Sequence, residues 1–202
     1  MDILESMFDI KNEELIVWNN EVVMSSTERD YFEKLFSFLK KYSFDNILEI
    51  GYGLGISAGL IQKLLKPNRH DIVEINDEIY KDLLGFSKSH SNIKPLHDDW
   101  NNLSKNQFYD FIFSDPYDYT MDYSDLDAFT LRKNRFLALS QLIKNGGILC
   151  IPHFGDGYPQ KDLYGYFTLV DNILLDVEPI LMDDHTECDK CRILTYEKLS
   201  IK

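Results

Sequence analysis

Three glycines at alternate positions, Gly51, Gly53 and Gly55, directly follow a short apolar segment of the chain. Glycine adopts positive φ angles without steric cost, and its bare backbone lets N–H groups come close to a ligand. A second strand-like segment contains Glu74 near its end, where a carboxylate can accept hydrogen bonds from both hydroxyls of a ribose. The turn and the acid together predict a site for a cofactor that contains a nucleoside.

The spacing of these glycines separates two kinds of nucleoside cofactor. Dinucleotide-binding folds use the order Gly-x-Gly-x-x-Gly, whereas this chain has Gly-x-Gly-x-Gly, which indicates a single adenosine without a pyrophosphate. Asp99 and Trp100 follow a third strand-like segment. There an acid can accept the adenine amino group, and an aromatic ring can pack beside the base. The alternatives are a solvated turn acid for Asp99 and a core or lid aromatic for Trp100.

The elements that must position these residues alternate along the chain. Apolar spacing predicts helices at residues 27–42, 55–66, 77–88, 126–143 and 163–174, with Gly146-Gly147 as the stop of the fourth. Strands are expected at residues 46–50, 71–75, 93–96, 109–114, 147–152, 178–182 and 191–196. This order predicts an α/β fold whose Rossmann-like, seven-stranded sheet is mostly parallel, ends in an antiparallel C-terminal hairpin and carries helices on both faces.

Ligands of such sheets bind beyond the carboxyl ends of the parallel strands. Gly51, Glu74, Asp99 and Asp115 all lie at the carboxyl ends of predicted strands, so we expect them to meet at one edge. No repeat or linker divides the chain. We therefore expect one compact unit, with an N-terminal helical lid or substrate segment at 1–45 and the sheet domain at 46–202.

The composition narrows the choice of partners. The 202 residues have a formal net charge of −13, and no stretch reaches the roughly 18 apolar residues that a membrane helix needs. A negative field repels phosphate backbones and anionic membrane surfaces and attracts cationic substrates. The acidic start of the chain lacks the basic region of a secretory signal. We expect a cytoplasmic protein that binds neither nucleic acid nor membrane, and we leave a homodimer open.

Histidine and cysteine are spaced as His185-x-x-Cys188-x-x-Cys191, with Cys150 and His153 elsewhere. A structural zinc site needs four converging ligands, and a single Cys-x-x-Cys beside one histidine indicates such a site only weakly. We therefore expect no metal.

Several segments carry a resemblance to a known family: Val23-Met24 with Glu28 and Phe32, residues 49–56 and 74–76, Pro95-Leu96 with Trp100, and residues 110–115 and 189–192. They resemble class I S-adenosylmethionine-dependent methyltransferases, and more closely the guanidinoacetate N-methyltransferase family with its arginine N-methyltransferase relatives. The glycine turn is shared widely among methyltransferases. More specific to this family is the combination of Met24 and Glu28 with Asp115 and the terminal Cys191-Arg192.

The resemblance implies S-adenosylmethionine as the cofactor and S-adenosylhomocysteine as its product. It implies that Glu28 and Asp115 hold the guanidino group of a small-molecule or arginine-containing acceptor, with Asp115 as the primary anchor and either carboxylate as the proton acceptor. Where the family has Thr-Tyr after this aspartate, the chain has Pro116-Tyr117. We expect Tyr117 to line the acceptor pocket, in an aromatic cluster with Tyr119 and Tyr123. The implied cofactor residues are Met24, Phe32, Gly51, Tyr52, Gly53, Leu54, Gly55, Ile56, Glu74, Ile75, Asn76, Asp99 and Trp100.

Three other functions remain open from the sequence. Asp115-Pro116-Tyr117 partly matches the D/N-P-P-Y pattern of amino-methyltransferases that act on amides or nucleobases, although the second proline is missing. Ser114-Asp115-Pro116 is also similar to aminopropyl transferases, whose additional acid is absent at Leu54. The third is a protein that binds S-adenosylmethionine without transferring its methyl group.

Overall fold

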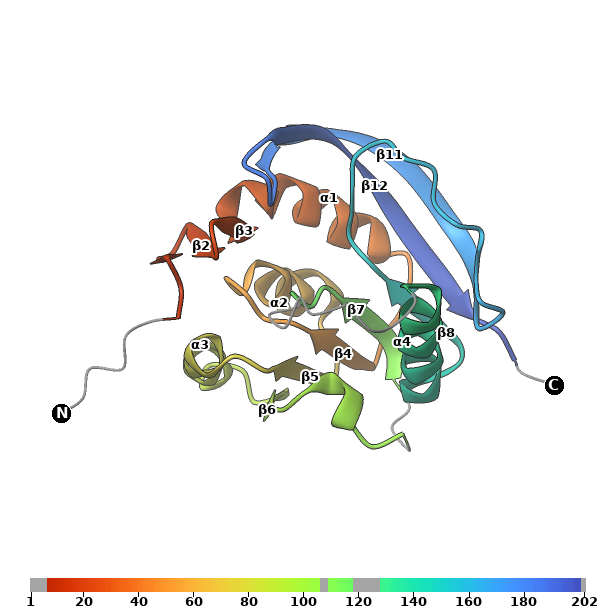
Figure 1. Cartoon of the computed structure of the whole chain (residues 1–202). Coiled ribbons are helices and arrows are strands. Elements are labelled where there is room, and N and C mark those ends of the chain that lie inside the picture. The colour runs from red at the N-terminus through yellow and green to blue at the C-terminus, as the bar shows by residue number, and fades with distance from the viewer. Residues whose placement is uncertain (1–6, 106–108, 118–127, 201–202) are drawn as a thin grey trace.

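A nine-stranded sheet forms the centre of the computed structural model, which describes residues 7–105, 109–117 and 128–200 (Figure 1). Its strands are β4 (Asn46–Ile50), β5 (Arg69–Glu74), β6 (Ile93–His97), β7 (Tyr109–Ser114), β8 (Ile143–Cys150), β9 (His153–Phe154), β10 (Asp162–Leu163), β11 (Phe167–Leu181) and β12 (Glu187–Lys198). The order across the sheet is β10-β11-β12-β8-β7-β4-β5-β6, and β9 pairs with β12.

The pairing confirms the predicted sheet. Five adjacent strands run parallel to one another, in the order β6, β5, β4, β7 and β8. Strand β12 runs antiparallel to β8 and to β11. Seven strands have five or more residues, and the two that were not predicted, β9 and β10, have two residues each. The fold is therefore a Rossmann-like α/β fold with an antiparallel hairpin at its C-terminal end.

Helices cover both faces of this sheet because its central strands are apolar on both sides. The helices are α1 (Arg29–Leu39), α2 (Ile56–Leu60) continued by the π-helical turn η2 (Ile61–Leu65), α3 (Asp77–Ser87) and α4 (Ala128–Leu142). Ile47, Phe111 and Phe113 pack with α1 and α2. Their neighbours Leu48 and Ile112 point to the opposite face and pack with α4. Successive side chains of a strand alternate between faces, so the same short segments supply both cores.

One predicted helix is wrong. Residues 163–174 do not form a helix: they contain the last residue of β10, a turn and the first half of β11, which pairs with β12 along most of its length. The hairpin of β11 and β12 extends past the sheet and curves beside α1 (Figure 1). Lys34 Nζ donates to the carbonyl of Asp176 at 3.0 Å, and the amide of Glu178 donates to Asp30 Oδ2 at 2.9 Å. Pairing with a long partner strand and contact with α1 therefore override the local apolar spacing.

The fourth helix does not end at the predicted glycines. α4 ends at Leu142, and β8 begins at the next residue. Gly146 and Gly147 lie inside β8, where the register against β7 shifts and Gly146 has a φ of +74°. The two glycines thus form a bulge in the strand rather than the end of the helix.

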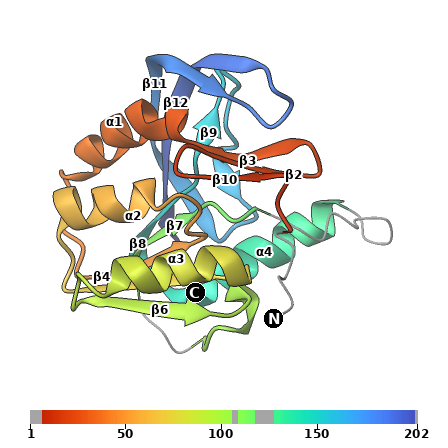
Figure 2. The ribbon, with the colours of Figure 1, turned by 90° about the vertical axis from the view of Figure 1, so that its left-hand side faces the viewer.

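The N-terminal segment is only partly helical. Residues 10–25 form a separate three-stranded antiparallel sheet of β1 (Ile10–Lys11), β2 (Leu15–Trp18) and β3 (Glu21–Ser25). A 3₁₀ turn, η1 (Ser26–Glu28), connects β3 to α1. The expected helix at 27–42 is confirmed as α1, and the described residues before it contain the three strands and η1 instead of further α-helix (Figure 2). No helix in the described ranges is long and apolar enough to cross a membrane.

Candidate functional site

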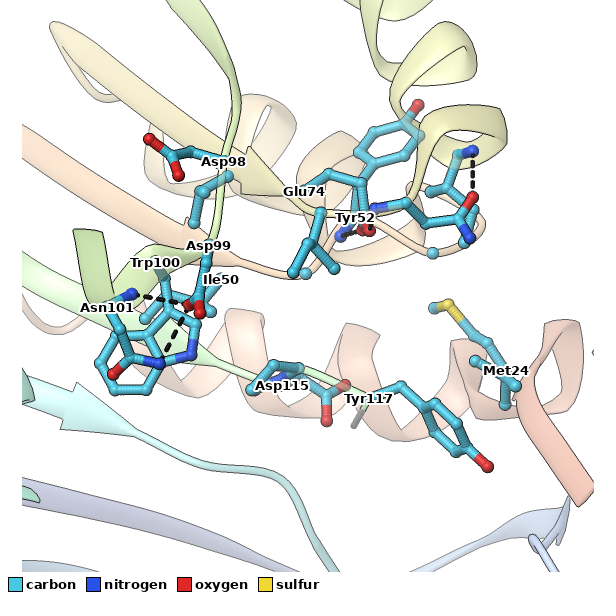
Figure 3. Close-up of a pocket in the computed structure, with 18 of the residues that line it drawn as sticks. Met24, Ile50, Tyr52, Glu74, Asp98, Asp99, Trp100, Asn101, Asp115 and Tyr117 are labelled. Atoms are coloured by element: carbon cyan, nitrogen blue, oxygen red, sulfur yellow. Dashed lines mark hydrogen bonds between the residues drawn. The ribbon is translucent and has the colours of Figure 1, made fainter. Parts of the chain in front are cut away.

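A cavity of about 1380 Å³ opens at the carboxyl ends of β4, β5, β6 and β7. Figure 3 shows the predicted residues of this edge around one opening, with Asp99 and Trp100 on one side and Met24 on the other. Most of the residues expected to bind cofactor or acceptor line the cavity: Met24, Gly51, Tyr52, Gly53, Glu74, Ile75, Asn76, Asp99, Trp100, Asp115 and Tyr117. The topology therefore brings together side chains that lie up to about ninety residues apart in the sequence.

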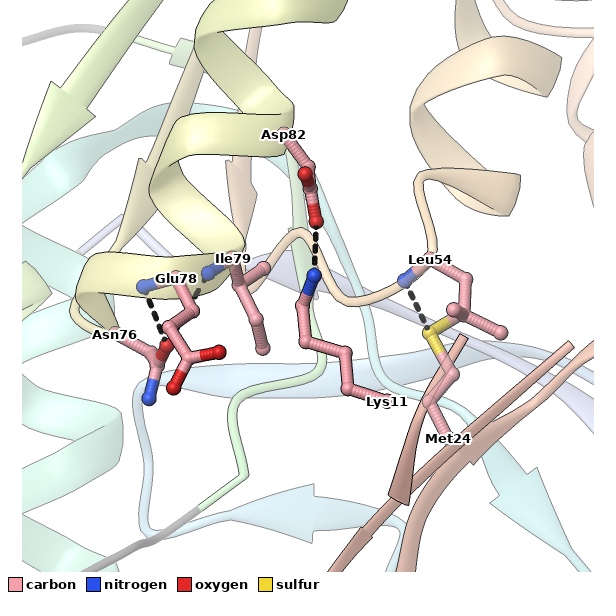
Figure 4. A network of polar contacts seen from close by, with 7 residues as sticks. All are labelled: Lys11, Met24, Leu54, Asn76, Glu78, Ile79 and Asp82. Atoms are coloured by element: carbon pink, nitrogen blue, oxygen red, sulfur yellow. Dashed lines mark hydrogen bonds and ion pairs between the residues drawn. The ribbon is translucent and has the colours of Figure 1, made fainter. Parts of the chain in front are cut away.

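The glycine turn has the geometry that its spacing predicts. Gly51, Gly53 and Gly55 have φ angles of +89°, +53° and +71°. A Cβ on Gly51 would lie 2.6 Å from the backbone oxygen of Asp115, and a Cβ on Gly53 would collide with the sulfur of Met24. Met24 covers the turn, since its Sδ accepts a hydrogen bond from the amide of Leu54 at 3.0 Å (Figure 4). Backbone conformation and close packing both require glycine here.

Glu74 is buried at the end of β5 and is held by the backbone on both sides. Its Oε2 accepts from the amide of Tyr52 at 3.0 Å, and its Oε1 accepts from the amide of Asn76 at 2.8 Å. Burial raises the pKa of Glu74, and the amide of Tyr52 opposes this rise. Asn76 caps α3 by accepting from the amides of Glu78 and Ile79 (Figure 4). The turn and the helix start thus fix the carboxylate at the cavity wall.

Asp99 and Trp100 form the opposite wall. Asp99 Oδ1 accepts from the amide of Asn101 at 2.8 Å and caps the short 3₁₀ turn η3 (Trp100–Asn102). Ile75, which follows the neighbouring strand β5 and also lines the cavity, is 52% exposed although it is apolar. An exposed isoleucine beside an aromatic ring and a carboxylate gives this end of the cavity the mixed lining that a flat, polar-edged ring requires.

Two further carboxylates, Asp115 in the cavity and Glu28 behind its wall, have raised pKa values. Asp115 follows β7 and is open to the cavity. Desolvation by the surrounding protein raises the pKa of Asp115 to about 6, while Arg135 lowers it and Glu49 raises it. Glu28 is buried, and desolvation, followed by the charge of Asp115, raises the pKa of Glu28 to about 8. The charge of Asp115 therefore acts on Glu28, although the two residues are far apart in the chain.

Glu28 also has a local structural role. Its Oε1 accepts from the amide of Ser25 at 2.9 Å, and the Ser25 hydroxyl accepts from the amide of Thr27, which completes a capping box around η1. Glu28 is not among the residues that line the cavity. It lies behind the wall, within the electrostatic reach of Asp115.

Tyr117 connects the cavity to the N-terminal sheet. Its hydroxyl donates to Glu21 Oε2 at 2.7 Å, and its ring meets the ring of Trp18 edge to face, with 6.1 Å between the centroids. Tyr119 and Tyr123 lie outside the described residues. The sequence did not indicate Glu21, because only the docking of β3 brings it to Tyr117.

Four other expected cofactor residues do not line the cavity: Phe32, Leu54, Gly55 and Ile56. Phe32 is fully buried and packs against Phe36 and Phe113 in the core. Ser57, two residues after the glycine turn, does line the cavity, and its place in the first turn of a helix was a usable indication. Arg132 and Arg135 of α4 also line it, and no local pattern pointed to them.

Comparison with known proteins agrees with this geometry. The family model for guanidinoacetate N-methyltransferase matches residues 4–156, which is more than half of the chain. No curated protein matches the sequence. The solved structure of the N-methyltransferase NodS from Bradyrhizobium japonicum, in complex with S-adenosyl-L-homocysteine, is similar with a TM-score of 0.62 and 17% identity over 87% of this chain and 89% of that chain.

A second solved structure, TehB from Haemophilus influenzae, has a TM-score of 0.57 and 16% identity over 85% of this chain and 67% of that chain. At these identities the structures establish the fold, and the family match establishes the relationship. The chain belongs to the guanidinoacetate N-methyltransferase family of class I S-adenosylmethionine-dependent methyltransferases.

Proposed function

We propose that this methyltransferase transfers a methyl group from S-adenosylmethionine to a guanidino nitrogen of a small molecule or an arginine-like acceptor. Asp115 is the primary anchor of the acceptor, Glu28 supports its opposite edge, and Tyr117 forms part of its wall. The observation that carries the proposal is the coupling of the two carboxylates: the charge of Asp115 helps to raise the pKa of the buried Glu28 to about 8.

This coupling suits a cationic acceptor. At neutral pH, a carboxylate with a pKa near 8 is mostly protonated, because burial removes it from water and because a second negative charge near Asp115 is unfavourable. A guanidinium held at Asp115 would stabilise both negative charges, since Asp115 can accept paired N–H bonds from the planar cation and its charge acts on Glu28 behind the wall. The pair therefore favours a positively charged, planar group over a neutral one.

The same pair addresses the main chemical difficulty of the reaction. A guanidinium has a pKa of about 12.5–13.8, so its nitrogens are poor nucleophiles at neutral pH. Carboxylates that hold its N–H groups draw electron density to the nitrogen and accept the proton that leaves. A carboxylate with a raised pKa is a stronger base than an ordinary one. Asp115, open to the cavity, and Glu28, behind it, are the two candidate proton acceptors.

The residues at the other end of the cavity fit the cofactor. Glu74 would accept from the ribose hydroxyls, and Asp99 and Trp100 would hold the adenine ring. The glycine turn leaves no space for a side chain at Gly51, so its backbone faces the cavity directly. When bound, S-adenosylmethionine supplies the electrophilic methyl group. The protein's contribution is to hold the acceptor nitrogen in line with it, which is a large part of the rate enhancement in two-substrate reactions.

Asp115→Asn tests the anchor role. We expect at least a hundredfold loss of kcat/KM for a guanidino acceptor, because each charge-assisted hydrogen bond contributes about 1.5–3 kcal/mol. The Kd for S-adenosylhomocysteine, measured by calorimetry, should stay within about threefold of the wild-type value. Asp189→Asn, an exposed aspartate on β12, is the matched control. Wild-type turnover by Asp115→Asn would refute the role.

The acceptor class is tested separately with labelled S-adenosylmethionine and a mass-spectrometric panel. Guanidinoacetate, arginine, agmatine and arginyl peptides represent guanidino acceptors, and adenine nucleosides and glutaminyl peptides represent the alternatives. We expect product only with guanidino compounds. Methylation of an amide or a nucleobase alone would contradict the proposal, and cofactor binding without any transfer would indicate a binding protein.

A further inference from the structure

Glu49 lies beneath the glycine turn and has no contact with solvent. It is the penultimate residue of β4, and the turn that holds Gly51, Gly53 and Gly55 begins two residues later. Its Oε1 accepts a hydrogen bond from the hydroxyl of Ser57, in the first turn of α2. One carboxylate oxygen therefore connects the two ends of the turn, from the strand before it to the helix after it.

The other oxygen of Glu49 faces His70, which is also fully buried. His70 Nε2 lies 2.9 Å from Glu49 Oε2, although the ring N–H does not point straight at this oxygen. Neither atom has a hydrogen-bond partner among the described residues, so each has only the other to offset its burial. A buried polar atom without compensation is costly. The position of the Glu49 carboxylate thus depends on His70.

The contact on the far side of the ring determines which nitrogen carries the proton. Gln62 Nε2, in η2, lies 3.0 Å from His70 Nδ1. An amide nitrogen can only donate, so Nδ1 must accept and carries no hydrogen. In a neutral imidazole the proton then resides on Nε2, facing the carboxylate. Gln62 therefore sets the tautomer in which the proton of His70 lies on the side of the Glu49 carboxylate.

Gln62, His70, Glu49 and Ser57 form a row of contacting side chains. Only Ser57 of these four lines the cavity. Any shift of the carboxylate moves the Ser57 end of the turn relative to β4. The glycines, whose backbone geometry leaves little freedom, then shift too. The charge of Glu49 also helps to raise the pKa of Asp115, so the same carboxylate lies close to both ends of the site.

We propose that His70, in its neutral Nε2–H tautomer and supported by Gln62, is a positioning residue for the cofactor. It holds Glu49 against Ser57 and so keeps the glycine turn in the conformation that binds S-adenosylmethionine. The acceptor plays no part in this arrangement, so the proposal can be tested without it and stands apart from the guanidino assignment.

Two substitutions of His70 separate positioning from packing. His70→Leu fills the space but cannot donate, whereas His70→Gln places an amide donor close to the position of Nε2. We expect His70→Leu to raise the Kd for S-adenosylhomocysteine at least about tenfold, the value of one hydrogen bond to a charged group. His70→Gln should stay within about threefold of the wild type.

Leu194→Ala is the control for lost stability. Leu194 is buried in β12, in the core on the α4 side of the sheet. This variant should lose stability in urea unfolding without a change in Kd. If His70→Leu lowers the free energy of unfolding but leaves the Kd within twofold of the wild type, His70 is merely a core residue and the proposal is overturned.

Gln62→Leu provides the second variant should His70→Leu fail to fold, because Gln62 is only half-buried. A rise in Kd of threefold or more supports the proposal, and an unchanged Kd overturns it. Nitrogen-15 NMR of the His70 ring gives a direct readout of the tautomer. A protonated Nε2 with an unprotonated Nδ1 is the expected result, and a proton on Nδ1 overturns the assignment.

Discussion

At the scale of single residues, Glu28 combines a structural contact with an electrostatic penalty. Its Oε1 completes the capping box with Ser25, yet its charge would be buried beside Asp115. The pKa of Glu28 is therefore raised from 4.5 to about 8. A carboxyl group whose pKa is higher in the folded state stabilises the fold while it is protonated. That stability is lost as the pH rises through the folded-state value.

We predict that Glu28→Gln becomes more stable than the wild type as the pH rises. Glutamine keeps the acceptor for the Ser25 amide and carries no charge. The two proteins should have similar free energies of unfolding near pH 4.5. Between pH 4.5 and 8 the free energy of unfolding of the variant should rise relative to that of the wild type, by at most roughly 5 kcal/mol. Urea unfolding at several pH values measures this difference. Glu33→Gln, on the exposed face of α1, should show no such trend. A constant difference would contradict the raised pKa.

At the scale of elements, the glycine turn and the strand that carries Asp115 are packed backbone to backbone. The amide of Asp115 donates to the carbonyl of Ile50 at 3.0 Å, and a Cβ on Gly51 would lie 2.6 Å from the carbonyl oxygen of Asp115. Backbone atoms cannot rotate away as a flexible side chain can. The cofactor turn and the acceptor anchor are therefore positioned by the same contact.

We predict that Gly51→Ala impairs both ends of the site. The positive φ and the clash with backbone should lower the free energy of unfolding by about 1–3 kcal/mol and raise the Kd for S-adenosylhomocysteine by at least about tenfold. Gly59→Ala is the matched control: it lies in α2, where a Cβ meets nothing within 4 Å, and should stabilise the protein by about 0.5–1 kcal/mol. Urea unfolding and calorimetry measure both effects. Unchanged binding by Gly51→Ala would contradict the close packing.

At the scale of the whole molecule, the cavity lies between the central sheet and the small N-terminal sheet. Lys11 Nζ pairs with Asp82 Oδ2 at 2.6 Å, and the amide of Val22 donates to the carbonyl of Asp183 at 3.2 Å. These contacts attach the small sheet to α3 and to the turn between β11 and β12. The described lining of the cavity holds six acidic and three basic side chains, within a chain of formal net charge −13. Such a field attracts cations and weakens with salt.

We predict that salt weakens the binding of S-adenosylmethionine more than that of S-adenosylhomocysteine. The two molecules differ by the methyl group and the positive charge of the sulfonium. Between about 20 mM and about 500 mM sodium chloride, the Kd for S-adenosylmethionine should rise about threefold more than the Kd for the neutral product, because screening shortens the reach of the acidic field. Calorimetry with both ligands is the measurement. Equal salt dependence would mean that the field of the protein does not act on the sulfonium.

The sequence alone determined the features that depend on neighbouring residues. Strands β4 and β7 have the predicted bounds, and the glycine turn has positive φ angles, because apolar runs and glycine spacing act within a few residues. The edge at which Gly51, Glu74, Asp99 and Asp115 meet was predictable as well, since the carboxyl ends of parallel strands always share one side of a sheet.

Tertiary structure decided what depends on partners distant in the chain. Residues 167–174 became strand because β12 offers a long partner, and Phe32 became core because the buried face of α1 turns it toward Phe113. Arg135 reaches the cavity only through the docking of α4, and Glu21 meets Tyr117 only through the docking of β3. Local spacing specifies which face of an element is apolar, whereas the rotation of that element and its partner are set by packing energies summed over the whole core.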